Sequence, residues 1–273
     1  MYFQSLAFGA LLAFYLCVNR SYHFILASIL MGSMATAATI DLTGTIRDFK
    51  GVNEPGGHPD FEAVIGGLQT GAVDTFLSAG LPVFTGSGKP GFSNAENFDE
   101  WFRDVSGVNQ RSTLTITLSN AGTPGVYSYS NANFFPIDNQ MFGNTPGWDR
   151  NYHFTYDIHS LFGFHGGETL SFTGDDDVWI FVNNKLAVDL GGVHSAKTRS
   201  ITFDPSTAAN FGLIGGNSYS MDLFFAERHT SQSTFNLQTT LDVASPAAEP
   251  SSLLLISAGI CVLAFTGKRQ GII

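Results

Sequence analysis

Between residues 39 and 245, apolar and polar positions alternate in short runs that are separated by Gly, Pro, Asn and Ser. Thr39–Phe49 is the first such run, and Arg111–Ser119 alternates strictly. A period of two residues predicts β-strands with one buried face. Later runs predict further strands at Tyr127–Ser130 (an edge strand), His153–Ile158, Thr169–Thr173, Thr198–Phe203, Ser218–Ala226 and Phe235–Val243. Many short strands with few helices indicate an all-β sandwich or barrel.

One run departs from this alternation. Val178–Val182 (VWIFV) consists of five consecutive apolar residues of β-branched or aromatic type, which predicts a strand buried on both faces. Asn183 and Asn184 follow it, and because Asn tolerates a positive φ they predict a tight hairpin turn. Leu186–Val188 is then the returning strand of the hairpin.

Two segments suggest helices instead of strands. Asn94–Val105 follows an N-cap candidate, Ser93 or Asn94, and four of its apolar residues recur at the spacing of one helical face: Phe98, Trp101, Phe102 and Val105. A second short helix is expected at Asp60–Thr70. We therefore expect one or two short helices beside the strands.

The N-terminal segment, residues 1–38, has the pattern of a secretory signal. An apolar core at His23–Met31 follows Arg20, and Ala35–Ala37 has the A-x-A form, so cleavage is expected near Ala37 or Ala38. A further apolar run, Tyr2–Val18, precedes the charge. It fits either a start codon assigned too far upstream or a single transmembrane anchor.

In the C-terminal segment, residues 246–273, Glu249-Pro250-Ser251 leads into a short apolar run that ends at Phe265, and Lys268-Arg269 follows. This layout resembles the PEP-CTERM sorting signal of bacteria. The resemblance implies an exosortase-type sorting enzyme as a partner and a bacterial cell surface as the destination, although Ala248 stands where the motif has its first proline. The alternative is an ordinary membrane tail anchor. Residues 39–245 are then the folded domain.

Composition narrows the function further. Acidic residues outnumber basic ones by 23 to 13, for a net charge of −10. This balance argues against nucleic-acid binding, which needs clustered Lys and Arg, and fits cations or neutral sugars better. Cys17 and Cys261 are the two cysteines of the chain, and both lie in the end segments, so the predicted domain has no disulfide or thiolate site. The histidines lack zinc-site spacing.

Three adjacent carboxylates, Asp175–Asp177, precede the apolar strand at Val178–Val182. Like charges in a row need either solvation or a cation. The stretch GDDDVWIFVNNKLAVDLGG, from Gly174 to Gly192, resembles the signature of the PA-14 family and of its fibro-slime subset. Other blocks fit the same family in the same order: His58–Glu62 (HPDFE), Leu81–Asn109, Phe134–Asp138, His153–Phe172 and Asp222–Thr230.

This resemblance implies a PA-14-like antiparallel β-sandwich with a Ca²⁺ site. In PA-14-type adhesins two adjacent aspartates joined by a cis peptide hold a Ca²⁺ ion that also binds sugar hydroxyls, and Asp175 and Asp176 match that pair best. Two carboxylates and loop carbonyls can supply the oxygen ligands that Ca²⁺ requires. Asp177 would stand behind them or cap a turn. The alternative is that the aspartates cap turn amides in a solvated loop.

Further ligand-binding residues are expected by position. In a sandwich of this type the loop Glu227–Ser233 should face the acidic turn and offer Glu227, His229, main-chain carbonyls and the nearby Asn236. Trp148 lies in a loop and is the candidate for stacking on a sugar, whereas Trp179 belongs to the apolar strand and is expected in the core.

The sequence thus predicts an exported, non-enzymatic module of the cell surface or extracellular matrix that binds an envelope or extracellular polysaccharide with the help of Ca²⁺. Two alternatives stay open. One is a structural matrix protein without a ligand. The other is an activity in polysaccharide hydrolysis, for which no pair of carboxylates stands out and no G-x-S-x-G motif is present.

Overall fold

The computed structural model describes residues 38–62, 64–120 and 122–243. Two short helices, α2 (Ala95–Asp99) and α3 (Pro205–Phe211), accompany the strands in this part of the chain. The strands are β1 (Thr39–Phe49), β2 (Asn109–Ser119), β3 (Tyr127–Asn131), β4 (Phe154–Gly163), β5 (Thr169–Asp175), β6 (Asp177–Val182), β7 (Lys185–Leu190), β8 (Lys197–Thr202), β9 (Ser218–Glu227), β10 (Thr234–Thr239) and β11 (Asp242–Val243). The predicted all-β class with one or two short helices is confirmed.

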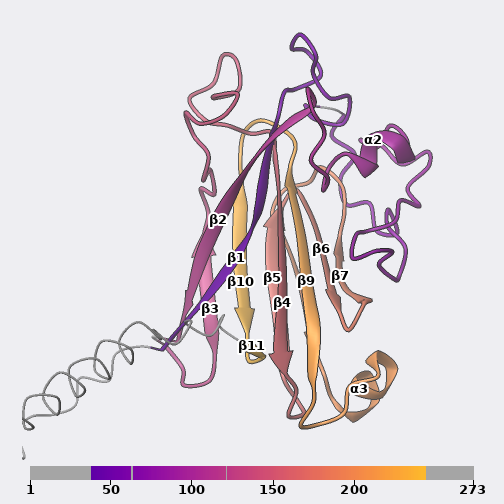
Figure 1. Ribbon diagram of the computed structural model, residues 1–273, viewed down its shortest axis with the longest axis vertical. Helices are drawn as coiled ribbons and strands as arrows, with labels where there is room; N and C mark the ends of the chain where they lie inside the picture. The colour runs from indigo at the N-terminus through magenta and orange to yellow at the C-terminus, as the bar shows by residue number, and fades with distance from the viewer. Residues whose placement is uncertain (1–37, 63, 121, 244–273) are drawn as a thin grey trace, which may run out of the picture. The chain divides into compact units, whose positions relative to one another are not determined.

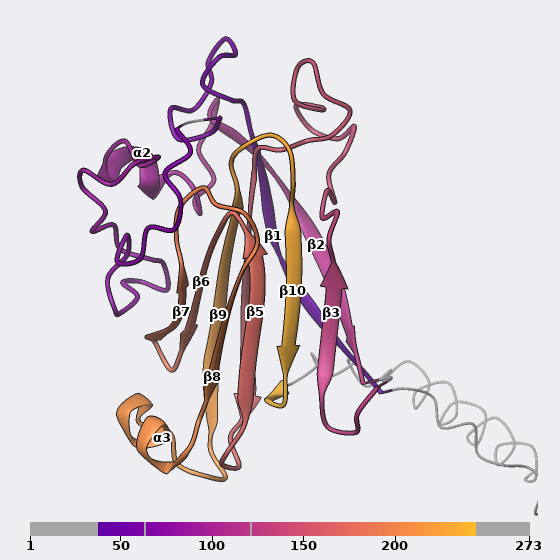
Figure 2. The same ribbon diagram turned by 180° about the vertical axis from the view of Figure 1, so that it is seen from behind.

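All of the strands described here belong to one antiparallel sheet. Its order is β7-β6-β9-β4-β1-β2-β3-β10-β5-β8, and β11 pairs with β4. The sheet folds over, so that the half containing β4, β9 and β6 faces the half containing β3, β10 and β5 (Figures 1 and 2). The main core fills the space between the halves, where the rings of Phe225 on β9 and Phe235 on β10 lie 5.3 Å apart.

The apolar strand β6 is buried on both faces, as predicted. Val178, Ile180 and Val182 point into the main core, while Trp179 and Phe181 point to the outside of the sheet, where a second apolar cluster covers them. Asn183 and Asn184 both have positive φ and connect β6 to β7 as a tight turn. The burial of both faces explains why no polar residue interrupts this strand.

Residues 50–108 form a covering segment over this second cluster. Figure 1 shows the part that carries α2 lying beside β6 and β7. Phe61, Phe98 and Trp101 of this segment pack with Trp179 and with Phe224 of β9. The covering segment is therefore an irregular second layer, built mostly from loops, that buries aromatic rings on the outer face of the sheet.

Three of the predicted elements differ in the structure. Asn94 is the N-cap, and its side chain accepts a hydrogen bond from the Asn97 amide, but α2 ends at Asp99 because the aromatic residues after it pack on the sheet in turns. The helix expected at Asp60–Thr70 is wrong, since main-chain amides there bond to other segments. The strand β3 is not at an edge but lies between β2 and β10.

The end segments, residues 1–37 and 244–273, lie outside the described residues. The predicted secretory signal and sorting tail therefore stay predictions. Within residues 38–62, 64–120 and 122–243, no helix is long and apolar enough to cross a membrane.

Replacing Trp101 tests the role of the covering segment in stability. Trp101 is fully buried and donates a hydrogen bond from Nε1 to Asp60. We expect Trp101→Ala to lower the free energy of unfolding by about 3–5 kcal/mol in urea denaturation. Trp148→Ala is the control, because Trp148 is 48% exposed and its loss should change stability by less than about 0.5 kcal/mol. Equal effects would contradict this account of the second layer.

Candidate functional site

The acidic triplet lies where the chain passes from one half of the folded sheet to the other. Asp175 ends β5, Asp177 begins β6, and Asp176 is the single residue between the strands. The peptide bond between Asp175 and Asp176 is cis. At Gly174, just before the crossing, an added Cβ would lie 2.4 Å from a methyl carbon of Val178, so a side chain at this position would collide with the next strand.

Asp175 and Asp176 line a pocket of about 130 Å³ at this end of the sheet. The other walls come from the loop after β7 and from the loop after β9. The lining residues are Ile65, Asp175, Asp176, Val193, His194, Ser195, His229, Thr230, Ser231 and Gln232. The structure thus places the loop after Glu227 opposite the acidic turn, where the sequence predicted it.

The two aspartates are withdrawn from water, with 5% of Asp175 and 2% of Asp176 exposed. The carboxylate of Asp176 accepts hydrogen bonds from the amides of His194 (3.2 Å) and Arg228 (3.0 Å). Among the described residues, no ion pair includes either aspartate. The two aspartates therefore do not lie in a solvated loop, which was the alternative left open from the sequence. Turn amides do bond to Asp176, as that alternative also expected.

Asp177 has a structural position. It is fully buried, its carboxylate bonds to the amide of Gly192, and its second oxygen accepts from Nε of Arg228 at 2.6 Å. The guanidinium of Arg228 also lies 4.5 Å from the ring centre of Trp101, which ties the triplet to the covering segment. Asp177 therefore caps a turn and neutralises Arg228, and it does not line the pocket.

Glu227 lies at the end of β9 and is fully buried. Neither of its carboxylate oxygens has a hydrogen-bond partner among the described protein groups, and the same holds for the hydroxyl of Ser233. It does not line the pocket. The chain therefore keeps a third carboxylate near Asp175 and Asp176 without giving it a protein partner.

Burial and like charge act together on these acids. Burial raises the pKa of Asp175, and burial and the neighbouring Asp177 charge raise the pKa of Asp176 well above its usual range. The pKa of Glu227 is also raised well above its usual range, by burial first and then by the charge of Asp176. Protons or a cation would relieve the repulsion, because both remove net negative charge from the site.

Two other predicted ligand residues lie away from the pocket. Asn236 on β10 uses its side-chain oxygen to accept from the hydroxyl of Ser130 (2.8 Å) and the amide of Asn131 (2.9 Å), so it joins β10 to β3. Trp148 packs edge-on against Tyr152 at 5.5 Å and is not among the lining residues. Asn236 therefore has a cross-strand role, and sugar stacking by Trp148 stays a prediction outside this pocket.

Two residues of the covering segment that contact the pocket or its loop were not predicted from the sequence. Ile65 lines the pocket, and Glu62 bonds to Thr230 on the pocket's loop. The HPDFE block that ends at Glu62 was a signal of family resemblance but did not reveal this contact.

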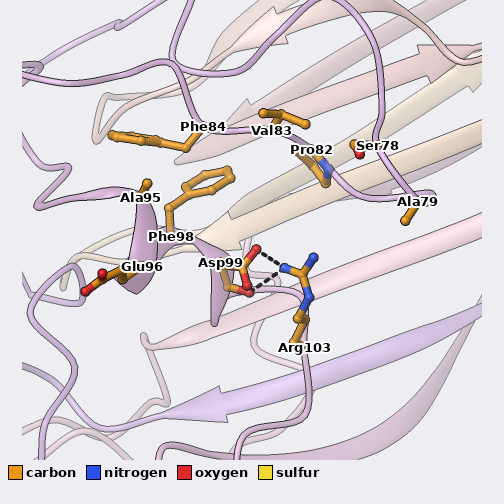
Figure 3. A pocket seen from close by; sticks show the side chains of 10 residues that line it. All are labelled: Ser78, Ala79, Pro82, Val83, Phe84, Ala95, Glu96, Phe98, Asp99 and Arg103. Atoms are coloured by element: carbon orange, nitrogen blue, oxygen red, sulfur yellow. Dashed lines mark hydrogen bonds and ion pairs between the residues drawn. The ribbon is translucent and has the colours of Figure 1, made fainter.

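A larger pocket of about 430 Å³ lies in the covering segment and shares no residue with the acidic pocket (Figure 3). The rings of Phe84 and Phe98 form one part of its wall, and Arg103 pairs with Asp99 on another. Both members of that ion pair are well exposed. Because these two exposed side chains neutralise each other, they do not indicate a charged ligand. The smaller acidic pocket is therefore the better candidate for a functional site.

Side chains alone do not complete a metal site here. Among the described residues, no group of three or more His, Cys, Asp or Glu side chains is arranged to hold a metal ion. A cation at Asp175 and Asp176 would need main-chain carbonyl or water oxygens as its remaining ligands, a mixture that Ca²⁺ accepts and that Zn²⁺ sites seldom use.

Comparison with known proteins identifies the family of the chain. The family model described as "PA14 domain" matches residues 100–253. Relatives from Dictyostelium discoideum include Protein psiQ (36% identical, covering 82% of this chain and 24% of that protein), Protein psiD (36%, 79% and 43%) and Protein psiR (37%, 76% and 22%). The chain spans less than half the length of these relatives. They give no support to the bacterial surface that the sequence analysis inferred.

Solved structures show only a distant likeness. The PA14 sugar-binding domain from an RTX adhesin is 11% identical and covers 76% of this chain and 96% of its own, with a TM-score of 0.31. The PA14 domain of the MpAFP antifreeze protein is 9% identical, with coverages of 48% and 71% and a TM-score of 0.28. These values carry no argument by themselves. The family model, however, matches more than half of the chain, and the chain therefore belongs to the PA14 domain family.

Proposed function

We propose that this PA14 domain is a non-enzymatic binding module that holds Ca²⁺ at Asp175 and Asp176 and binds a glycan through it. The observation that carries the proposal is the burial of two adjacent carboxylates in the wall of a pocket, where no cationic side chain of the described residues forms an ion pair with either of them. Buried charges without a partner are costly, and a bound cation is one way to meet that cost.

The donor chemistry of the pocket fits a hard cation. Asp175 and Asp176 would supply carboxylate oxygens, and the loop that contains Thr230 and Ser231 lines the same pocket and offers main-chain carbonyls as further oxygens. Glu227, whose carboxylate has no hydrogen-bond partner among the described residues, is a further acid near the pair, and a bound cation would favour its ionised form. Ca²⁺ takes six to eight oxygen ligands in flexible geometry, which suits such a mixed set.

The protein's own groups would orient the ligand. Bound Ca²⁺ supplies positions at which two neighbouring sugar hydroxyls can replace water. His229, Thr230 and Gln232 line the same pocket and offer hydrogen-bonding groups to the rest of the sugar. A site of this kind gives modest affinity, which repetition on a surface would strengthen.

An extracellular polysaccharide on a cell surface or in a matrix is the partner that fits this role. The proposal also includes export through the N-terminal segment and a sorting enzyme or membrane contact at the C-terminal segment, and both rest on the sequence alone.

The alternative function is that of a structural protein without any ligand. Calcium and glycan binding distinguish it from the proposed binding module.

Calcium titration of the full-length chain is the first test. At a Ca²⁺ concentration about 100 times the Kd, a single site that is absent from the unfolded chain stabilises the fold by about 2.7 kcal/mol. We expect this stabilisation, measured by thermal or urea unfolding, to disappear in the Asp175→Asn/Asp176→Asn variant.

The control for this titration is Asp242→Asn, the same chemical change at an exposed aspartate on β11. It should keep the full effect of Ca²⁺. An unchanged unfolding curve of the wild-type chain in excess Ca²⁺ would leave the structural alternative.

The affinity for Ca²⁺ should fall in acid. The cation binds the ionised carboxylates, and because the pKa values of Asp175 and Asp176 are raised, protons compete at a higher pH than for an ordinary aspartate. We expect the Ca²⁺ Kd from calorimetry to rise between about pH 7 and pH 5. A Kd that stays constant over this range would contradict the assignment of the buried pair as ligands.

Glycan binding should require the cation. On a glycan array, we expect signals from the wild-type chain with Ca²⁺ and none after addition of EDTA or for the Asp175→Asn/Asp176→Asn variant. Trp148→Ala should keep its signals, because Trp148 does not line the pocket. Signals that survive EDTA would place the glycan site elsewhere.

A further inference from the structure

The covering segment fastens both loops that wall the acidic pocket. On one side, the amides of Gly67 and Gln69 donate to the carbonyls of Val193 (2.9 Å) and Gly191 (2.6 Å). On the other side, the amide of Glu62 donates to the carbonyl of Arg228 at 2.6 Å. The shape of the pocket therefore depends on a segment that is distant in sequence from both loops.

The side chain of Glu62 makes several contacts between the covering segment and the pocket's loop. Its carboxylate accepts from the Thr230 amide (3.0 Å) and from the Thr230 hydroxyl (2.8 Å), one on each oxygen. His153, the residue before β4, bonds to the same carboxylate at 3.1 Å, and His229 lies 3.6 Å from it. One side chain thus joins the pocket's loop to the sheet.

We propose that Glu62 is the positioning residue of the ligand-binding loop, and that it sets the affinity of the acidic pocket by fixing Thr230 and the carbonyls around it. This inference rests on the function proposed above. Glu62 is not among the residues that line the pocket, so it would act through its hydrogen bonds to Thr230 and not as a ligand.

The charge state of Glu62 suits this task. Burial by itself would raise its pKa, but the hydrogen bonds from His153 and Thr230 outweigh burial and lower the pKa to about 2. The carboxylate therefore stays ionised through the neutral and mildly acidic range and keeps accepting from the loop. Hydrogen bonds to a charged acceptor are stronger than those between neutral groups.

The neighbouring Asp60 provides a matched control. Its carboxylate accepts from the Ser93 amide (2.8 Å) and from Nε1 of Trp101 (3.2 Å), both inside the covering segment. Asp60 and Glu62 are thus two buried or partly buried acids on one turn, of which only Glu62 bonds to the pocket's loop through its side chain. Asp60→Asn should destabilise the fold without altering the loop.

The experiment compares Glu62→Gln, Glu62→Ala and Asp60→Asn with the wild-type full-length chain. Hydrogen exchange of the Thr230 amide, measured without added metal, is expected to speed up at least about tenfold in Glu62→Ala and less in Glu62→Gln, which keeps one acceptor. The calorimetric Kd for Ca²⁺ should rise by about tenfold in Glu62→Ala. Asp60→Asn should change neither quantity, although its unfolding midpoint falls.

The outcomes separate this inference from the proposed function. If the wild-type chain binds no Ca²⁺, the proposed function fails. The positioning role is still tested without metal, because an unchanged exchange rate of the Thr230 amide in Glu62→Ala would overturn it. If the wild-type chain binds Ca²⁺ and Glu62→Ala binds it equally well, only the inference about Glu62 is overturned. Thr230→Val, which removes one of the same hydrogen bonds from the loop's side, replaces Glu62→Ala if that variant does not fold, and it should raise the Kd in the same direction.

Discussion

The structure depends on how buried negative charge is compensated where the chain crosses from β5 to β6. Asp177 and Arg228 form an ion pair with no exposure to water. The guanidinium of Arg228 also donates hydrogen bonds to the carbonyls of Asp60 and Gly91 in the covering segment. Breaking such a pair leaves an uncompensated charge and costs several kcal/mol. The pair therefore holds the sheet, the crossing and the covering segment in one arrangement.

This compensation is incomplete in a way that matters for function. One guanidinium serves three consecutive aspartates and the nearby Glu227, and its side chain bonds directly to Asp177 alone among these four acids. Asp175 and Asp176 are left in the wall of the pocket with raised pKa values. Residues with strongly perturbed pKa values in a pocket are frequent at functional sites, and the Ca²⁺ that we propose here would offset the local excess of negative charge.

Much of the fold follows from local patterns in the sequence. The alternating run Thr39–Phe49 is β1 with the same bounds, and the apolar run after the aspartates is buried on both faces because the covering segment lies over its outer side. The hairpin turn at Asn183-Asn184 also agrees with its positive φ values. Periodicity and turn chemistry decide these features, and both are visible within about ten residues of sequence.

The details of the site were less predictable because they come from contacts between distant segments. The pair Asp175-Asp176 could be proposed from a motif, but the contact between Glu62 and Thr230 joins residues that are 168 positions apart. Asn236 shows the opposite error, since its position near the loop suggested a ligand while cross-strand hydrogen bonds to β3 direct its side chain elsewhere. Local sequence does not encode which of several nearby polar side chains faces the pocket.

A crystal structure of the chain grown in calcium chloride would show whether the buried aspartate pair is a cation site. We expect an ion bonded to carboxylate oxygens of both Asp175 and Asp176 at about 2.3–2.6 Å, with further oxygens from the loop that contains Thr230. Carboxylates bonded only to main-chain amides, with no ion between them at saturating calcium, would contradict it.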